Sequence, residues 1–343
     1  MRPKKIAILH FNVIEKYPPV MNFIYDAIEE NPGVQILVFT TKNTTTYQTP
    51  KFPNTRIYRF GKVSSNPLVR YFSYINYNLF SSLILLYCKV DFITAFETIS
   101  IFPLWFKNLT KPKTKAHIHF HEYLSMQERM VGSAYMKFMF KLEDQLLREN
   151  TCSQTNEDRK CLFLEDKPFI KPEQVEVRPN MPPKSWWTTY GQYKKPSSDG
   201  KLSLVHVGTC DNNTMYVKEV LDWVSANQNS FELTFISQEI HKETNDLILS
   251  YNCPVIKIIP PIDYYQLPQE LVKYDIGLVL YKGHIPNYVY NVPNKVYEYL
   301  ACGLGVLTSV KLTSTINLKH KKIRAIDFSD LQDEVLQEYL DKF

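Results

Sequence analysis

Glycine is scarce in this chain, with 10 among 343 residues. The one G-x-G, Gly303-Leu304-Gly305, follows an expected helix instead of opening one. A dinucleotide-binding fingerprint places its glycines between a strand and the helix that the loop opens. The sequence therefore excludes a Rossmann dinucleotide fingerprint.

Paired cysteine motifs and long apolar runs are also missing. None of the six cysteines forms C-x-x-C. Scattered cysteines of this kind indicate reduced thiols in a cytoplasmic protein. The longest apolar stretch, Leu79 to Cys88, is interrupted by Ser81 and Ser82 and is too short to span a bilayer. The run after the basic start is too short for a signal peptide. We expect a cytoplasmic protein.

Charge is shared unevenly along the chain, which carries a formal net charge of +5. Residues 1–180 contain 24 Lys and Arg against 17 Asp and Glu, whereas residues 201–343 contain 13 against 17. A basic first part favours an anionic surface or acceptor, with scattered solvated charge as the alternative. Nucleic acid is not expected as a partner, because no recognition motif accompanies the charge.

Strand-like and helix-like segments alternate in two regions. In the first, strands at Ile6–His10 and Val34–Thr40 flank a helix at Val20–Glu30. In the second, a strand at Leu202–Val207 begins a similar series. Such alternation predicts the α/β class, with two Rossmann-like doubly wound domains facing a cleft. The expected division is a first domain at 1–180, a Pro- and Ser-rich linker at 181–200, a second domain at 201–329 and a final helix at 330–343.

A long aromatic helix is expected from Leu68 to Lys89. The simpler interpretation is a helix that covers the first sheet. The alternative is an aromatic face at a membrane interface, although this stretch lacks the lysine-rich polar face of interfacial helices.

The stretch from Asn291 to Ser309 organises the second region. It reads as a loop, a short helix, a turn at Gly303 and a strand. Lys295 and Glu298 lie three residues apart on one face of that helix. An ammonium group and free helix N–H groups suit phosphates, and a carboxylate suits ribose hydroxyls. The alternative is an ordinary ion pair on a solvated face.

The run Pro-Asn-Lys-Val-Tyr-Glu-Tyr-Leu-Ala-Cys-Gly-Leu-Gly-Val-Leu resembles the nucleotide-sugar motif of GT-B glycosyltransferases, especially family 4. The resemblance implies that Glu298 holds the donor ribose, that Lys295 lies by the diphosphate and that Asn294 lines the same site. Two positions depart from the family pattern. Gly305 replaces the usual proline, and Tyr290 replaces a second glutamate, which weakens the case for a retaining mechanism.

Two further positions are candidates for donor binding. Gly208-Thr209 ends the first strand of the second region, where glycine lets a phosphate approach the backbone and threonine adds a hydroxyl. An ordinary strand-end turn is the alternative. Many family 4 members carry Arg and Lys shortly after this glycine, and this chain does not. Lys282, after a later strand, is a candidate for the missing charge.

The first region contains three alternating histidines, at positions 117, 119 and 121. Alternate residues of a strand lie about 7 Å apart, so three of them do not easily grip one zinc ion. We therefore predict no metal site. His121 and Glu122 follow the strand, and either one suits a catalytic base. A hydrogen-bonded strand-end pair is the alternative. The loop His10–Glu15 is a weaker candidate for acceptor contact, and Glu15 and Glu97 are alternative bases.

Together these features predict transfer of a sugar from a nucleoside-diphosphate sugar to an acceptor hydroxyl, with no cofactor and no divalent metal. The expected acceptor is a saccharide or a lipid-linked saccharide in bacterial surface polysaccharide synthesis, at the inner face of the plasma membrane. A nucleotide-sugar epimerase or a noncatalytic scaffold of the same fold is the alternative. The expected peripheral membrane contacts are Arg70, Lys107, Lys111, Lys113 and Lys115, which flank Trp105 and Phe106.

Overall fold

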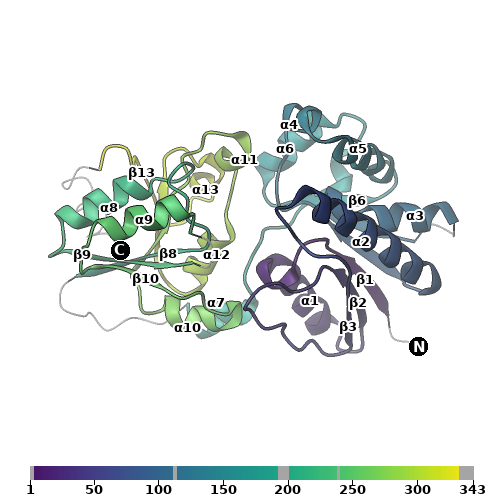
Figure 1. The fold of residues 1–343 in the computed structure, drawn as a ribbon, viewed down its shortest axis with the longest axis horizontal. Helices are drawn as coiled ribbons and strands as arrows, with labels where there is room; N and C mark the ends of the chain where they lie inside the picture. Colours follow the sequence, from purple (N-terminus) through teal and green to yellow (C-terminus); the bar gives the residue numbers. More distant parts are fainter. Residues whose placement is uncertain (1–3, 111–113, 192–200, 238–239, 332–343) are drawn as a thin grey trace. The chain divides into compact units, whose positions relative to one another are not determined.

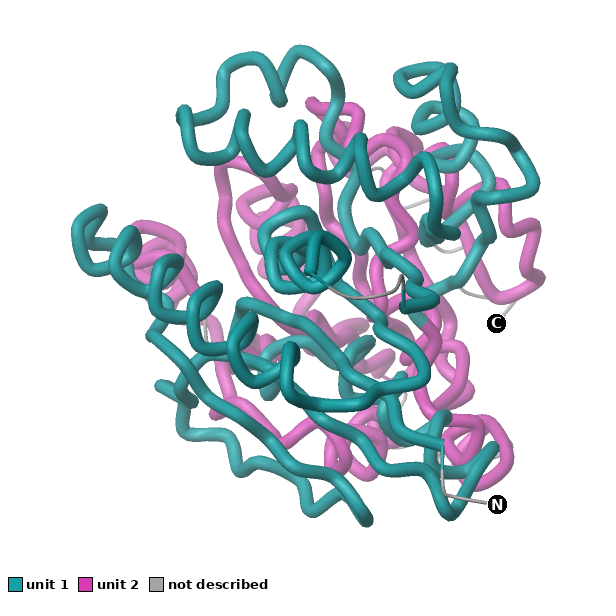
Figure 2. The backbone as a smooth tube through the Cα atoms, turned by 90° about the vertical axis from the view of Figure 1, so that its right-hand side faces the viewer, with its two compact units in different colours: residues 1–180 teal, residues 181–343 magenta. Residues whose placement is uncertain are grey.

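The computed structural model describes residues 4–110, 114–191, 201–237 and 240–331 (Figure 1). The chain divides into two compact units, Met1–Asn180 and Met181–Phe343 (Figure 2). Each unit is built around one parallel β-sheet. This architecture confirms the predicted α/β class with two Rossmann-like units.

The sheet of unit 1 has the order β3-β2-β1-β4-β5-β6-β7, and its paired strands run parallel. Its strands are β1 (Lys5–Leu9), β2 (Gln35–Thr40), β3 (Thr55–Arg59), β4 (Phe92–Phe96), β5 (Ala116–His119), β6 (Thr151–Gln154) and β7 (Val175–Val177). The strand order reverses between β1 and β4. In sheets of this kind ligands bind beyond the carboxyl ends of the strands at such a reversal.

Helices cover both faces of this sheet. They are α1 (Pro18–Glu30), α2 (Pro67–Tyr87), α3 (Phe102–Thr110), α4 (Met126–Val131), α5 (Ala134–Leu147) and α6 (Glu157–Asp166). Successive strand residues point to opposite faces. Ala7 and Leu9 accordingly pack in one cluster with Leu104 of α3 and Leu142 of α5, and Ile8 on the other face is also fully buried.

The sheet of unit 2 has the order β10-β9-β8-β11-β12-β13, again with parallel pairs. Its strands are β8 (Leu202–Val207), β9 (Phe231–Ile236), β10 (Ile256–Ile259), β11 (Ile276–Val279), β12 (Gly305–Ser309) and β13 (Ile323–Ile326). Its helices are α7 (Lys184–Thr189), α8 (Val217–Ala226), α9 (Lys242–Ser250), α10 (Leu267–Leu271), α11 (Pro286–Val289), α12 (Asn294–Ala301) and α13 (Thr313–Asn317).

The two faces of this sheet belong to two separate apolar clusters. Leu204 and Leu278 pack with the α8 side chains, whereas their neighbours Val205 and Val279 pack with Tyr299 of α12. The strand order reverses between β8 and β11. The carboxyl ends of these two strands lead into the loops that carry Gly208 and Lys282.

One sequence expectation differs from the structure, and another falls almost wholly outside the described residues. The stretch 181–200 was expected to be a linker, but its residues Lys184–Thr189 form α7. Trp186 of that helix is buried and packs against Tyr264, with ring centroids 5.0 Å apart. Apolar burial of this tryptophan outweighs the Pro-rich composition around it. The expected helix at 330–343 lies almost wholly outside the described residues.

Within the described residues, no helix is both long and apolar enough to cross a bilayer.

Candidate functional site

Helix α12 carries the motif of unit 2 and lies against β11 and β12. Pro293 takes the N-cap position, and Gly303 beyond the helix has a φ of +82°. All residues from Lys295 to Ala301 are buried. Lys295 and Glu298 are therefore not an ion pair on a solvated surface.

Tyr299 fixes α12 against the sheet. Its hydroxyl oxygen accepts a hydrogen bond of 3.0 Å from the backbone N–H of Val207, at the end of β8. Its ring lies over Gly277 of β11, where an added Cβ would stand 2.1 Å from the ring carbon Cδ2. Only glycine leaves room for this ring. This close approach, together with the hydrogen bond to Val207, fixes how near α12 packs to the sheet.

We expect Gly277→Ala to destabilise unit 2 and to weaken any ligand held by α12. The new methyl group overlaps the Tyr299 ring, and overpacking of this kind costs about 1–3 kcal/mol. Urea denaturation measures the loss. Gly33→Ala is the matched control, because its Cβ would meet its nearest atom at 3.7 Å. Equal stability of the two variants would show that Tyr299 does not set the position of α12.

Lys295 is buried among groups that hold its ammonium at the end of β8. Its Nζ lies 3.4 Å from Nε2 of His206 and 5.5 Å from the centroid of the Tyr281 ring. Nδ1 of His206 lies 3.2 Å from the carbonyl oxygen of Leu278. Nε2 lies equally 3.2 Å from the carbonyl oxygen of Thr209. A neutral imidazole carries one N–H, so Nε2 accepts from Lys295 in the tautomer that is protonated at Nδ1 and donates to Thr209 in the other. Sequence reasoning missed His206, which reads as an ordinary strand residue.

Burial shifts the ionisation of these groups. Desolvation lowers the pKa of Lys295 to about 8 and raises the pKa of Glu298 to about 7. Desolvation, and next the Lys295 charge, lower the pKa of His206 to about 3, so this imidazole is neutral at physiological pH. Within the described residues the hydrogen-bond partner of this buried ammonium is the neutral His206, and the charge of Glu298 favours its protonated form. Such an ammonium can receive an anion.

The loop after β8 lies beside this ammonium. Gly208 has a φ of +92°, and an added Cβ there would stand 3.7 Å from Nζ of Lys295. Thr209 is exposed, and Asn294 at the start of α12 is half-buried. Lys282 follows β11, and its Nζ donates to the carbonyl oxygen of Asn212 at 2.8 Å. The structure thus gathers the six predicted donor-binding residues around the carboxyl ends of β8 and β11, with Lys282 bound to the loop.

A second set of polar groups follows β1, β4 and β5 in unit 1. His10 follows β1, Glu97 follows β4, and His121 and Glu122 follow β5. The rings of His10 and His121 lie 6.4 Å apart, and His121 stacks on Phe96 at 5.3 Å. The predicted pair thus follows β5, one strand beyond the reversal of strand order, and the ring of His121 reaches His10 at that reversal.

The backbone of His121 is held on both sides. One carboxylate oxygen of Glu97 accepts from the N–H of His121 at 2.5 Å and from the N–H of Glu122 at 3.3 Å. The buried guanidinium of Arg159 donates to the carbonyl oxygen of His121 at 2.6 Å. Glu97 adopts a φ of +64°, an uncommon conformation for a residue with a side chain. Such local strain persists where the surrounding structure fixes it, often at functional sites.

These groups differ in protonation. Burial lowers the pKa of His121 to about 4, so its ring is neutral near pH 7. Burial, and next the charge of Glu122, raise the pKa of Glu97 to about 8. Both ring nitrogens of His121 are buried and have no hydrogen-bond partner of normal geometry among the described residues, although Asn180 lies near enough to act against the lowering of its pKa. The imidazole of His121 is therefore neutral near pH 7, and Glu97 holds the backbone of the loop.

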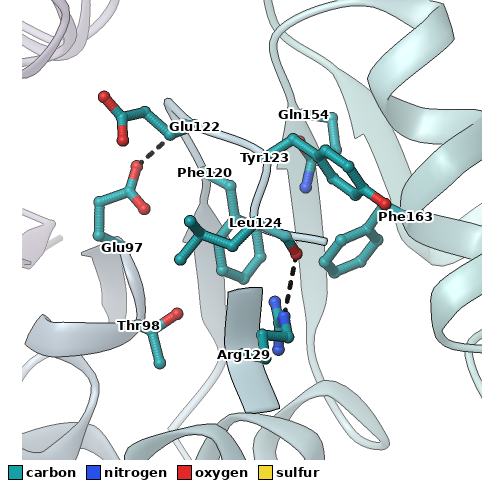
Figure 3. Close-up of a pocket in the computed structure, with 9 residues that line it drawn as sticks. All are labelled: Glu97, Thr98, Phe120, Glu122, Tyr123, Leu124, Arg129, Gln154 and Phe163. Atoms are coloured by element: carbon teal, nitrogen blue, oxygen red, sulfur yellow. Dashed lines mark hydrogen bonds between the residues drawn. The ribbon is translucent and has the colours of Figure 1, made fainter. Parts of the chain in front are cut away.

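A small hollow lies beside this loop (Figure 3). Glu97, Glu122 and Arg129 line it, and the guanidinium of Arg129 donates to the carbonyl oxygen of Leu124 at 3.2 Å. Arg129 also forms a buried ion pair with Glu143 at 2.8 Å. Arg129 thus links Glu143 of α5 to the loop that carries Glu122 and Leu124.

The other two of the three alternating histidines, His117 and His119, form hydrogen bonds within the sheet. Nε2 of His117 and Nδ1 of His119 each lie 2.7 Å from the hydroxyl oxygen of Ser153 in β6. Among the residues that the structure describes, no cluster of His, Cys, Asp and Glu could hold a metal ion. Of the alternative bases, Glu15 forms an ion pair with Arg59 at 2.5 Å.

Solved structures share this architecture, whereas no protein-family model and no curated protein sequence matches the chain. HepE of Anabaena, in complex with UDP and glucose, superposes with a TM-score of 0.69 at 12% identity, over 99% of this chain and 91% of its own. Sucrose-phosphate synthase from Thermosynechococcus elongatus gives a TM-score of 0.67 at 15% identity, over 99% and 90%. The lipopolysaccharide outer core galactosyltransferase WaaB gives 0.57 at 12% identity, over 89% and 80%.

The chain therefore has the GT-B fold, as the resemblance of its 291–309 stretch implied. Because the sequence identities are low, these neighbours show the architecture of the chain and not its reaction.

Proposed function

We propose that this protein is a glycosyltransferase that moves a sugar from a nucleoside-diphosphate sugar to an acceptor hydroxyl. One observation carries the proposal. Lys295 and Glu298 are buried one helical turn apart on α12, beside the glycine that ends β8. Structural neighbours with UDP in the same fold support it.

The donor nucleotide binds to unit 2 in this proposal. Lys295 and the N-terminal N–H groups of α12 meet the diphosphate, and Gly208 lets it approach the backbone. Glu298 accepts hydrogen bonds from the ribose hydroxyls. Thr209 and Asn294 add polar contacts, and Lys282 holds the loop around the phosphates. Charge on the leaving diphosphate is neutralised by these groups, so the proposed reaction uses no cofactor and no divalent metal.

The acceptor hydroxyl is activated from unit 1. His121 or Glu122 takes the proton of the hydroxyl as it attacks the anomeric carbon, and the bond from that carbon to the diphosphate breaks. Glu97 positions both candidates through their backbone N–H groups. We place the reaction in bacterial surface polysaccharide synthesis, with a saccharide or lipid-linked saccharide as acceptor. WaaB, a lipopolysaccharide galactosyltransferase of the same fold, supports that placement.

A screen of nucleotide sugars tests the proposal. UDP-, GDP- and other nucleotide sugars are compared by thermal stabilisation, and the best donor is then incubated with and without saccharide acceptors. We expect stabilisation by one nucleotide class and release of free nucleoside diphosphate that depends on an acceptor. A changed sugar without any acceptor would replace the proposal with an epimerase. Binding without turnover on any acceptor tested would favour the noncatalytic scaffold.

Nucleotide affinity should fall as pH rises above about 8. In the free protein the pKa of Lys295 is lowered to about 8, and a bound diphosphate favours the charged ammonium. Binding therefore takes up a proton above that pH, and the affinity for UDP falls by up to about tenfold per pH unit. Calorimetric titration at several pH values measures the slope. Lys295→Met should bind UDP more weakly with no such slope, and a flat wild-type profile would contradict the assignment.

A further inference from the structure

Helix α2 of unit 1 is turned with its apolar side outward. Its buried residues are Tyr77 and Leu85, which join the core, and four small or polar ones: Ser73, Asn78, Ser81 and Ser82. Eight large apolar side chains are exposed by between 41% and 85%. We call them the α2 stripe: Leu68, Tyr71, Phe72, Ile75, Leu79, Phe80, Leu83 and Tyr87. The helix lies beside α3 (Figure 1).

This orientation is unfavourable for a surface that meets only water. Each large apolar side chain gains roughly 1.5–3 kcal/mol when it is fully removed from water. Meanwhile the hydroxyl oxygens of Ser81 and Ser82 are buried with no hydrogen-bond partner in the described residues. A contiguous exposed apolar face of this kind marks an interaction site. The α2 stripe therefore calls for a partner that covers it.

The charge around α2 indicates the nature of that partner. Residues 31–90 contain seven Lys and Arg and no Asp or Glu. These seven account for the whole excess of positive charge in residues 1–180. They are Lys42, Lys51, Arg56, Arg59, Lys62, Arg70 and Lys89, and all but Arg59 are exposed. A partner for this surface is therefore anionic.

Several of these cations lie next to the helix. Gly61 packs so closely on α2 that an added Cβ would stand 2.8 Å from the carbonyl oxygen of Ser73. Lys62 follows it, and the backbone N–H of Lys62 donates to the hydroxyl oxygen of Ser73 at 3.1 Å. The backbone N–H of Lys42 donates to the carbonyl oxygen of Gly61 at 3.0 Å. The backbone of two exposed lysines, Lys42 and Lys62, therefore lies beside the first half of the α2 stripe.

The contacts expected from sequence need correction. Lys107 is buried, and its Nζ donates to the carbonyl oxygens of Leu85 at 2.9 Å and Cys88 at 3.2 Å. It caps the end of α2 and is not available to a membrane. Trp105 and Phe106 are half-buried, and Lys111 and Lys113 lie outside the described residues.

We propose that the α2 stripe, with Lys42, Lys62, Arg70 and Lys89, docks onto an anionic lipid bilayer. The 21 residues of α2 extend for about 30 Å, so the helix lies along the surface and inserts side chains to the depth of the headgroup boundary. Tyr71 and Tyr87, toward opposite ends, suit that boundary, where aromatic side chains with a polar tip are favoured. This docking is independent of the proposed sugar transfer and brings the protein to lipid-linked acceptors if that transfer is correct.

Co-sedimentation with vesicles tests the docking. The full chain is mixed with phosphatidylcholine vesicles and with vesicles that also contain phosphatidylglycerol. We expect binding to the anionic vesicles that weakens as salt shortens the Debye length below about 10 Å. The triple substitution Phe72→Ser, Leu79→Ser and Leu83→Ser should weaken binding at least about tenfold. Replacing Lys62 and Arg70 by glutamine should weaken it about fivefold for each cation.

Matched controls distinguish docking through the α2 stripe from unfolding and from self-association. Leu249→Ser removes an equally exposed leucine from α9 of unit 2 and should leave vesicle binding unchanged. Circular dichroism and urea denaturation verify that each variant is folded. Equal binding of the wild type to neutral and anionic vesicles would overturn the proposal. So would the absence of vesicle binding together with a dimer that the triple substitution dissociates, because the stripe would then contact a second copy.

Discussion

His121→Ala or Glu122→Gln is expected to lower turnover by about 10²-fold or more while nucleotide affinity stays unchanged. The two side chains leave the same short segment after β5, and their backbone is held by Glu97 and Arg159. His121 is a neutral base near pH 7 because burial lowers its pKa to about 4. Glu122 is exposed and lines the hollow beside this loop. Removing the working base takes away the acceptor of the hydroxyl proton.

Steady-state turnover with the best donor and acceptor, beside calorimetric titration with the nucleotide, separates chemistry from binding. Glu165→Gln is the matched control, because this exposed carboxylate belongs to α6 of the same unit. It should retain full turnover. Near-full turnover in both His121→Ala and Glu122→Gln would move the base elsewhere, with Glu97 as the next candidate. An equal loss of nucleotide affinity would mean that the loop serves the donor.

Glu298→Ala is expected to weaken nucleotide binding by about ten- to a hundredfold. A charge-assisted hydrogen bond contributes roughly 1.5–3 kcal/mol, and the carboxylate would make such bonds to the ribose hydroxyls. Tyr299 should keep α12 in place, because its hydroxyl remains bonded to the N–H of Val207. The loss should therefore come from the missing carboxylate and not from a displaced helix.

Glu298→Gln refines this result. The amide retains the shape of the side chain but lacks the charge, so an intermediate affinity is expected. Glu243→Gln, an exposed position on α9 of the same unit, is the matched control and should bind like the wild type. Unchanged affinity in Glu298→Ala, measured by titration calorimetry, would remove α12 from the donor site.

Much of the fold follows from local patterns. The strand Leu202–Val207 was predicted with its observed bounds, because a short apolar run between turn signals is typical of a buried parallel strand. The helix of the 291–309 motif follows from its apolar spacing and from Gly303. Each unit repeats such segments, and the alternation alone indicates two parallel sheets.

Contacts between distant segments could not be predicted in this way. His206 meets Lys295 across 89 positions, and a single histidine inside a strand gives no signal of that contact. Glu97 holds the backbone N–H groups of His121 and Glu122 and has a positive φ, which is uncommon for a residue other than glycine. Its residue type alone does not reveal these contacts. α7 was missed because the surrounding prolines favour a linker, whereas Trp186 finds an apolar pocket in unit 2.

Helix α2 shows a different limit. Periodicity tells which residues share a face of a helix, but it does not tell which face meets the sheet. α2 packs Tyr77 and Leu85 in one apolar cluster with sheet residues, as a helix that covers the sheet should, but it leaves many of its other apolar side chains exposed. Lys107 likewise reads as a surface cation until the carbonyl oxygens at the end of α2 are placed beside it.

The central claim is that unit 2 holds a nucleoside diphosphate between the end of β8 and the start of α12. Hydrogen exchange with and without saturating UDP tests it most directly, since bound ligand slows exchange at the backbone N–H groups that it orders. We expect slower exchange in peptides that contain Val207–Asn213 and Asn291–Val296 and no change in those of β9 and β10. Slower exchange confined to other peptides, or none at a UDP concentration that saturates binding in calorimetry, would contradict it.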